Sequence, residues 1–189
     1  MDIFVDAAAF FKEMQLEPTQ KFEHHDSIGD SKDLVEGFLY YFTHGAAGER
    51  YVNNATLFRQ MVDVAEKIPS SRKVVGGNAP VIANRLALEG AEVLLASTGA
   101  EDFTSNLHKK IKLAGDVVDY SDIHLILEYK SHETWGAHRS PRANRYIAIA
   151  DKYNPTISSL ESFADVYEKF NADLYVVGGL QVMDNYNFK

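Results

Sequence analysis

The segment Val74-Val75-Gly76-Gly77-Asn78-Ala79-Pro80 constrains the fold of this 189-residue chain more than any other segment. A β-branched pair runs into two glycines and a polar residue, and the helix-forming run Val81–Leu86 follows. This order is typical of a strand end, a tight turn and a helix start. Glycines let a ligand approach the backbone closely, and Asn78 is expected to cap the helix or to bind a polar molecule. Taken alone, the segment also fits an ordinary glycine-rich turn.

The composition limits the classes of partner. Hydrophobic residues make up 46% of the chain, which is enough for a packed core and excludes disorder. A net charge of −8 makes the chain a poor electrostatic partner for nucleic acid or for an anionic membrane. The absence of cysteine excludes disulfides and thiolate metal sites. We expect no membrane-spanning segment and no signal peptide, because no apolar run approaches ~20 residues and Met1–Asp6 is acidic.

Short apolar runs alternate with helical patterns in two regions, which predicts a parallel α/β layer. The segment His124–Tyr129 alternates like a half-exposed strand and is expected to pair with a strand over 144–150. The strands expected in the parallel layer are 73–75, 91–97 and 173–177, and the expected helices of the chain are 7–15, 33–42, 54–67, 78–90, 102–112 and 158–170.

Three motifs carry polar chemistry. The Gly76-Gly77-Asn78 turn lacks a dinucleotide fingerprint and a Walker lysine, so it suits hydroxyl groups at least as well as phosphates. Glu49 follows the small residues 45–48 and can accept two hydroxyl hydrogen bonds, although a solvated pair with Arg50 is the alternative. Arg145 lies in a basic segment that either grips phosphate or carboxylate oxygens or is a plain basic turn.

The histidine-containing segments do not predict a metal site. In His24-His25-Asp26, adjacent side chains of a polar loop usually point apart. The spacing of His132, Glu133 and His138 differs from that of a zinc protease motif. No Ser-His-Asp arrangement can be argued either, and we therefore expect no metal ligand and no catalytic residue among these groups.

Five stretches together carry a resemblance to a known family. In family order, across nearly the whole chain, they are Gly45-Ala46-Ala47-Gly48-Glu49-Arg50, Val75-Gly76-Gly77-Asn78-Ala79, His124–Tyr129 with Trp135-Gly136, Ala143-Asn144-Arg145-Tyr146-Ile147 and Val177-Gly178-Gly179-Leu180-Gln181-Val182-Met183. Through them the chain resembles the N-terminal part of the ADP-dependent glucokinases, of the ADP-dependent phosphofructokinase/glucokinase family. The resemblance implies a ribokinase-like α/β fold, incomplete here, with helices on both faces of a parallel sheet and a smaller β lid.

The resemblance also implies a reaction and site residues. Such enzymes transfer phosphate from ADP to the 6-hydroxyl of D-glucose with Mg²⁺, a step of glycolysis. By resemblance, the sugar would be held by Asp2, Glu49, Gly76, Gly77, Asn78 and Gln181, and Arg145 would face the nucleotide phosphates. The family's general base, an aspartate in a Gly-x-Gly-Asp turn, is expected beyond Lys189, so we expect the chain alone to lack kinase activity.

The resemblance places the α/β body mainly in 51–117 and 151–189, and the lid mainly in 3–50 and 118–150. Three alternatives remain: a non-catalytic sugar-binding or regulatory fragment, an ADP-dependent phosphofructokinase, and a chain that does not fold alone because its sheet lacks strands. The second would need extra basic residues near the sugar. Expected partners are glucose and ADP, without nucleic acid, and the chain is expected to be a monomer. Animal relatives are associated with the endoplasmic reticulum or secretory pathway, and the sequence leaves a cytoplasmic location open.

Overall fold

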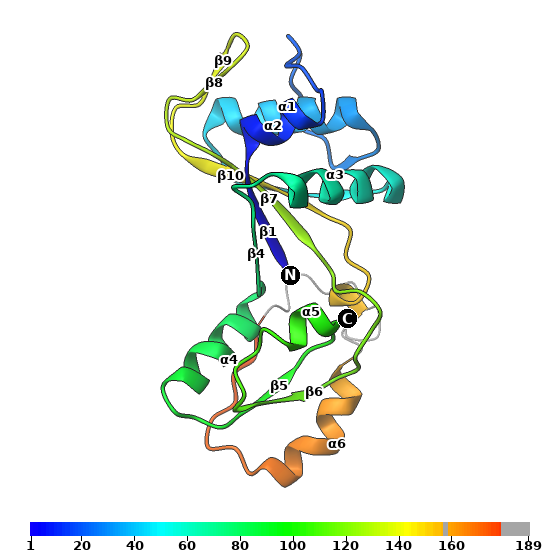
Figure 1. Ribbon diagram of the computed structural model, residues 1–189, viewed down its shortest axis with the longest axis vertical. Helices are drawn as coiled ribbons and strands as arrows, with labels where there is room; N and C mark the ends of the chain where they lie inside the picture. Colours follow the sequence, from blue (N-terminus) through cyan, green and yellow to red (C-terminus); the bar gives the residue numbers. More distant parts are fainter. Residues whose placement is uncertain (157–158, 179–189) are drawn as a thin grey trace. The chain divides into compact units, whose positions relative to one another are not determined.

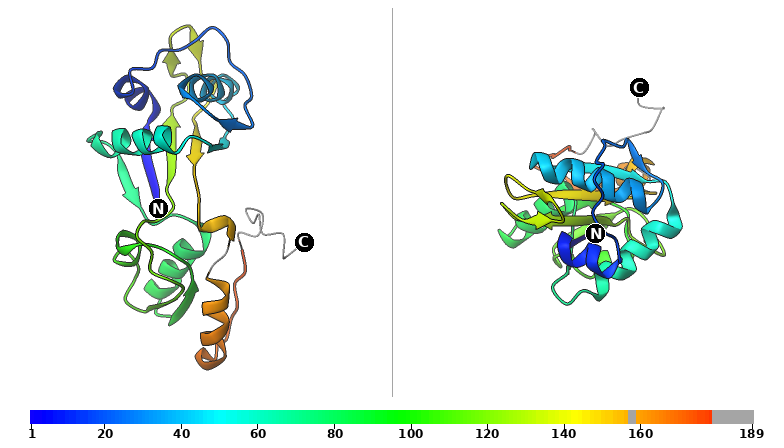
Figure 2. Two further views of the ribbon diagram at one scale, coloured as in Figure 1. Left: turned by 90° about the vertical axis from the view of Figure 1, so that its right-hand side faces the viewer. Right: turned by 90° about the horizontal axis from the view of Figure 1, so that it is seen from above.

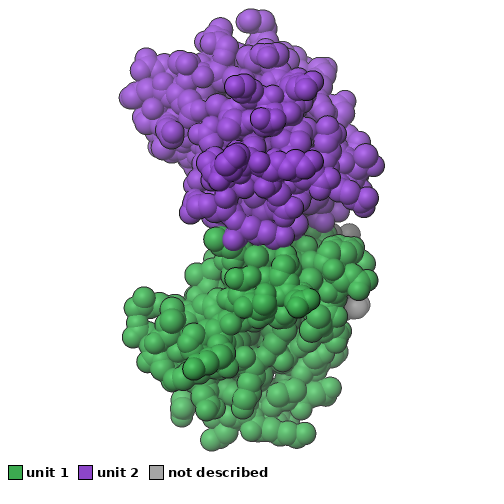
Figure 3. Space-filling view, viewed as in Figure 1, with its two compact units in different colours: residues 1, 74–122, 151–189 green, residues 2–73, 123–150 purple. Residues whose placement is uncertain are grey.

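The chain divides into two units whose segments interleave along the sequence (Figure 3). Unit 2 comprises residues 2–73 and 123–150, and unit 1 comprises residue 1, 74–122 and the segment that begins at 151. The computed structural model describes residues 1–156 and 159–178. Each unit is built around its own group of buried residues.

Unit 2 is organised by a six-stranded, mostly parallel sheet in the order β2-β3-β10-β7-β1-β4 (Figure 1). Strand β7 pairs in parallel with β1 and antiparallel with β10, and β10 pairs in parallel with β3. The antiparallel pair β7–β10 confirms the hairpin predicted over 124–150. The strands are β1 (Asp2–Asp6), β2 (Ser27–Ile28), β3 (Gly48–Val52), β4 (Arg72–Val74), β7 (His124–Tyr129) and β10 (Asn144–Ile149).

Three helices belong to the same unit and start at side-chain caps. They are α1 (Ala7–Glu13), α2 (Ser31–His44) and α3 (Ala55–Lys67). The carboxylate of Asp30 accepts hydrogen bonds from the first turn of α2, and the amide oxygen of Asn54 accepts one from Leu57 N at 3.0 Å. Such caps satisfy N–H groups that have no partner within the helix. All three helices match predicted ones, with ends that shift by a few residues.

An aromatic cluster fills the core between the helices and the sheet. The ring of Phe38 on α2 lies 4.7 Å from that of Phe11 and 5.7 Å from that of Tyr129. The small hairpin of β8 (Thr134–Trp135) and β9 (His138–Arg139) adds Trp135, which stacks on Phe11 at 4.4 Å. These contacts bury the inward-facing side chains of β1, β7 and β10 together with α1 and α2.

Unit 1 contains a two-stranded parallel sheet, β5 (Val93–Ala96) with β6 (Ile111–Ala114). Helix α4 (Asn78–Leu88) packs against β5, where Ala83, Leu95 and Phe103 form a small core. The unit also contains the helices α5 (Glu101–Thr104), η1 (Asn154–Thr156) and α6 (Leu160–Phe170), whose paths can be followed by colour in Figure 2. In the described part of the chain, no helix is both long and apolar enough to cross a membrane.

Several local expectations are corrected by the structure. The helix predicted over 102–112 ends at Thr104, because Ile111–Ala114 pairs with β5 as a strand instead. The buried strand predicted over 173–177 pairs with no strand in the described part of the chain, and Leu174 and Val177 are 70% and 77% exposed there. Asn78 is not the N-cap of α4, since Gly77 takes that position with φ 79° and no side-chain hydrogen bond.

The division into units also differs from the expected one. Residues 51–73 were expected in the α/β body with the glycine-rich turn, but they lie in unit 2. The reason is packing: Leu57, Met61 and Ala65 of α3 are buried in the same core as β1 and β7. The fold class itself is confirmed, since the chain is a mixed α/β protein with a mostly parallel central sheet and small additional sheets.

We predict that Leu39→Ala destabilises unit 2 by about 2–5 kcal/mol, because Leu39 is fully buried in the α2 core. Urea unfolding followed by the fluorescence of Trp135, the single tryptophan, measures this change because its ring packs on Phe11. The control is Leu88→Ala in unit 1, where the side chain is 68% exposed. An unchanged transition in Leu39→Ala would contradict the assigned core.

Candidate functional site

One face of the unit 2 sheet carries the candidate site. Side chains alternate along each strand, so that Ile3 and Val5 of β1 enter the core while Asp2, Phe4 and Asp6 point to the other face. Helices α1, α2 and α3 contribute their buried residues to the core on the first side. Within unit 2, all of whose residues are described, no helix covers the second side, which we call the open face.

The strand register aligns residues that are far apart in sequence on this face. Asp2 lies opposite His124, and Arg145 lies opposite Glu128. Ile147 lies opposite Glu49 on one side and opposite Ile126 on the other. Directly paired residues of neighbouring strands point to the same side of a sheet. The open face therefore carries the side chains of Asp2, Phe4, Asp6, Glu49, Tyr51, His124, Ile126, Glu128, Arg145, Ile147 and Ile149.

Charged groups of both signs lie on or beside the open face. Asp2 Oδ1 is 3.7 Å from His124 Nδ1, and Arg72 is 3.5 Å from the Glu128 carboxylate. The Arg72 guanidinium also stands over the Phe4 ring, at 5.0 Å from its centroid. By contrast, the exposed guanidinium of Arg145 makes no hydrogen bond or ion pair with any described residue. It is therefore available to an anionic ligand.

A hollow of about 740 Å³ lies at one end of this face, entirely within unit 2. Arg145 and Asn144 of β10 line it together with Phe4 and Asp6 of β1. A volume of this size is in the range of small-molecule sites. The remaining lining residues are Val5, Ala9, Ser70, Arg72, Glu128, Tyr129, Lys130 and Ala143.

The loop between α2 and β3 is held by hydrogen bonds from side chains of β7 and β10, and this positions Glu49. The Tyr129 hydroxyl donates a hydrogen bond shared between the carbonyl oxygens of Ala46, at 2.7 Å, and Tyr41, at 3.1 Å. Asn144 Nδ2 donates to the carbonyl of Gly45 at 3.0 Å. Gly45 ends α2 with φ 59°, a left-handed conformation that favours glycine. Burial raises the pKa of Tyr129 to about 12, so its hydroxyl stays protonated as a donor.

The structure places three of the seven predicted site residues on one sheet face. Asp2, Glu49 and Arg145 share the open face of unit 2. Gly76, Gly77 and Asn78 follow β4 and begin α4 of unit 1, in the predicted order of strand end, turn and helix. Gln181 lies outside the described residues.

Sequence reasoning did not single out His124, Glu128 or Arg72. The first two could have been found, because the alternation of the segment 124–129 places both on the same side as Ile126. Arg72 had no such signal, since its approach to Glu128 joins residues 56 positions apart.

A comparison with known families identifies the chain. The sequence profile described as the ADP-specific phosphofructokinase/glucokinase conserved region matches residues 1–189. The chain belongs to this family of ADP-dependent sugar kinases.

Two curated proteins that are similar in sequence to this chain agree with the assignment. The ADP-dependent glucokinase of Bos taurus is 29% identical over 186 residues, which cover 97% of this chain and 37% of that protein. The probable ADP-dependent glucokinase of Caenorhabditis elegans is 30% identical over 155 residues, covering 80% of this chain and 31% of that protein. The chain thus spans about a third of the length of these curated relatives.

The fold agrees with solved structures of the same family. A structure described as a hypothetical ADP-dependent phosphofructokinase from Pyrococcus horikoshii OT3 superposes with a TM-score of 0.64. It is 16% identical and covers 96% of this chain and 46% of the other. At this identity the likeness establishes the fold, with the mostly parallel sheet that carries the open face.

We predict that the free energy of unfolding of this chain falls as pH rises from about 10 to about 12. Tyr129 has its folded-state pKa raised to about 12, while an unfolded tyrosine titrates near 10, so the unfolded state loses its proton first. Desolvation also raises the pKa of the fully buried Tyr146. Chemical unfolding at a series of pH values measures the effect. Tyr129→Phe should show a smaller loss over this interval, and an equal loss would contradict the assignment.

Proposed function

We propose that the open face binds the sugar acceptor of an ADP-dependent phosphoryl transfer, and that this sugar is glucose. The observation that carries the proposal is that Asp2, Glu49 and Arg145 lie on the same face of one sheet, on β1, β3 and β10. Membership of the family and the names of the curated glucokinase relatives support the same reaction.

The residues of the open face suit a neutral sugar. Carboxylates such as Asp2 and Glu49 accept hydrogen bonds from hydroxyl groups. The partly buried side chain of Ile147 on the same face can pack on the C–H groups of a pyranose ring, next to the buried Ile126. The guanidinium of Arg145, without a partner among the described residues, can donate paired hydrogen bonds to phosphate oxygens.

We infer that the glycine-rich turn of unit 1 can by itself hydrogen-bond a hydroxyl group or an anion. Gly77 begins α4 with its backbone in the left-handed region and no side-chain cap. The first N–H groups of a helix lack partners within the helix and can donate to a hydroxyl or an anion. Asn78 is exposed and its side chain does not cap α4, so its amide is free for the same purpose.

The charges near the hollow favour glucose over a sugar phosphate. Two of the three cations that line it are neutralised within unit 2, since Arg72 lies 3.5 Å from Glu128 and Lys130 lies 3.9 Å from Asp6. Arg145 remains for a single anionic group. A sugar phosphate and a nucleotide phosphate would both need cations here, whereas glucose needs none.

Magnesium is implied by the resemblance alone. Magnesium prefers oxygen ligands and usually takes one or two carboxylates together with substrate phosphates. Among the described residues, the group of three close metal-ligating side chains lies at Glu23, His25 and Glu36, not on the open face. The open face therefore does not fit as a dedicated magnesium site, and no step of the proposal depends on the ion.

Calorimetric titration of the chain with glucose tests the proposal. We predict that Glu49→Gln weakens glucose binding by about tenfold, because a carboxylate that accepts two hydroxyl hydrogen bonds becomes an amide with one acceptor oxygen. Glu13→Gln is the matched control, since Glu13 is an exposed glutamate of α1. Tighter binding of fructose 6-phosphate than of glucose would favour the phosphofructokinase alternative.

Turnover is measured separately, in a coupled assay for glucose 6-phosphate with ADP and Mg²⁺. We expect binding without turnover from the 189 residues alone, because the resemblance implies that the general base lies outside them. Product formation by this chain would refute that part of the proposal. Absence of glucose binding would refute the assignment of the open face.

A further inference from the structure

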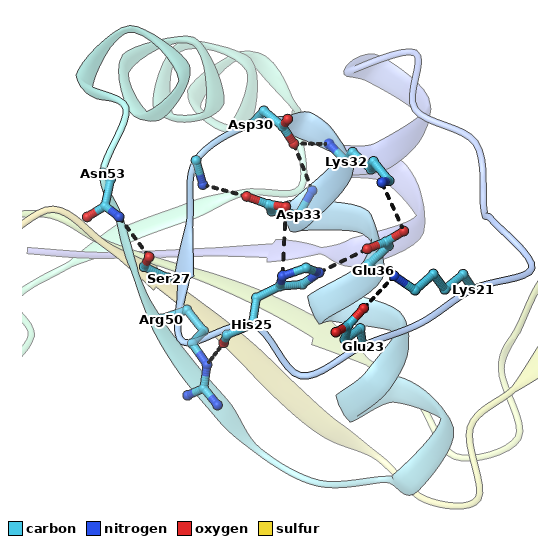
Figure 4. A network of polar contacts seen from close by, with 11 residues as sticks. Lys21, Glu23, His25, Ser27, Asp30, Lys32, Asp33, Glu36, Arg50 and Asn53 are labelled. Atoms are coloured by element: carbon cyan, nitrogen blue, oxygen red, sulfur yellow. Dashed lines mark hydrogen bonds and ion pairs between the residues drawn. The ribbon is translucent and has the colours of Figure 1, made fainter.

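We propose that Glu23, His25 and Glu36 form a binding site for a divalent transition-metal ion of the Zn²⁺ type, separate from the open face. Each of the three side chains offers a ligand atom, and these atoms lie within 4.8 Å of one another. They come from the loop before β2 and from the first half of α2 (Figure 4). Two carboxylates and one imidazole form a donor set used by Zn²⁺ and related ions.

The imidazole of His25 is oriented as it is in many metal sites. Its Nε2 lies 3.0 Å from Glu36 Oε2, and its Nδ1 lies 3.7 Å from Asp33 Oδ1, on the opposite side of the ring (Figure 4). Without an ion, the contact at 3.0 Å favours a proton on Nε2 that is donated to Glu36. An ion bound between Nε2 and Glu36 would take the place of this proton, and the ring proton would then lie on Nδ1, toward Asp33. Metal-bound histidines commonly have such a carboxylate behind the ligating ring. Asp33 would therefore fix the tautomer and would not itself bind the ion.

The burial of Glu36 gives the cluster a reason to attract a cation. Its side chain is 2% exposed, and a buried carboxylate is costly unless a positive charge compensates for it. The ammonium of Lys32 lies 3.8 Å away on a side chain that is 68% exposed. Lys21 pairs with Glu23 in the same way, with both side chains more than half exposed. Both lysines can rotate into solvent when an ion takes their place.

A second buried polar group ends beside the cluster. The Tyr146 hydroxyl is buried and has no hydrogen-bond partner among the described residues. A Cβ on Gly37 would lie 2.9 Å from this hydroxyl and 3.9 Å from Cδ2 of His25. The glycine thus leaves room for the tyrosine and the imidazole on the same side of α2. An unsatisfied hydroxyl at this place is a further oxygen available to an ion or to its bound water.

The loop that supplies two of the ligands is already held near α2 by its backbone. The N–H of Glu23 donates to the carbonyl of Glu36 at 3.4 Å, and the guanidinium of Arg50 donates to the carbonyl of His25. The ligand atoms are therefore brought together before an ion binds, which lowers the entropy cost of binding. The neighbouring His24 and Asp26 turn elsewhere: His24 contacts Arg50, and the Asp26 side chain is fully exposed.

Calorimetric titration of the 189-residue chain with Zn²⁺, without sugar or nucleotide, tests the proposal. We expect saturable binding of one ion per chain that excess Mg²⁺ does not displace, since an imidazole ligand disfavours Mg²⁺. His25→Gln should weaken the binding by more than about tenfold. His24→Gln is the matched control and should leave the affinity within about twofold, because this histidine is adjacent in sequence but not in the cluster.

The ligand role of the carboxylates is tested with Glu23→Gln, because Glu23 lies on an exposed loop and its substitution should not prevent folding. The fluorescence of Trp135 verifies that each variant is folded. Binding of Co²⁺ gives a visible absorption spectrum that reports the ligands, and we expect it to change in both His25→Gln and Glu23→Gln.

Three results would overturn the proposal: no one-to-one saturation with Zn²⁺, equal affinity in His25→Gln, or an equal loss in His24→Gln. The last would indicate scattered binding by the seven histidines of the chain. All three outcomes are independent of glucose binding and of kinase activity.

Discussion

The pairing of β7 with β1 on one side and with β10 on the other is the constraint on which the site depends. The parallel pairing of β7 with β1 begins at His124 and Asp2. Strand β7 also pairs with β10 over its whole length, in antiparallel register. This register sets His124 beside Asp2 and Glu128 beside Arg145, although the two ends of the site are more than 140 residues apart in sequence. No loop of unit 2 would need to move for these side chains to share one surface.

The two faces of this sheet contribute differently to stability and to ligand binding. The side covered by α1, α2 and α3 buries a continuous apolar and aromatic cluster, which supplies most of the stability of unit 2. The open side keeps partly buried isoleucines next to charged groups, an arrangement that contributes less to stability. Because the core lies against one face of this sheet, the other face can bind a ligand without loss of the core contacts.

Local signals in the sequence were sufficient for much of the fold. The β-branched residues, the two glycines and the following helical run predicted the order of β4, turn and α4, because each depends only on neighbouring residues. Asn54 or Thr56 was expected to cap the helix over 54–67 for the same reason, and Asn54 caps α3. The alternation over 124–129 predicted a half-exposed strand. The strand β7 forms and exposes Glu128, but Ile126 on the same side is buried.

The remaining features depend on contacts that the local sequence does not encode. The run after Thr104 has residues suited to a helix, but parallel pairing with β5 makes Ile111–Ala114 a strand. The proximity of His25 to Glu36 joins a loop to a helix, so the His24-His25-Asp26 motif gave no sign of it. The sharing of one face by Asp2, Glu49 and Arg145 required the strand order, which only tertiary packing fixes.

In strand β3, two consecutive residues serve the two faces of the sheet. Glu49 points to the open face, whereas Arg50 reaches Tyr41 and the backbone of His25 on the covered side. A one-residue insertion or deletion within the strand would exchange the two positions, because a register shift of one reverses every side chain. The carboxylate would then enter the core beneath α2 and the guanidinium would leave its hydrogen bonds. A change of length inside this strand would therefore damage the open face and the core at the same time.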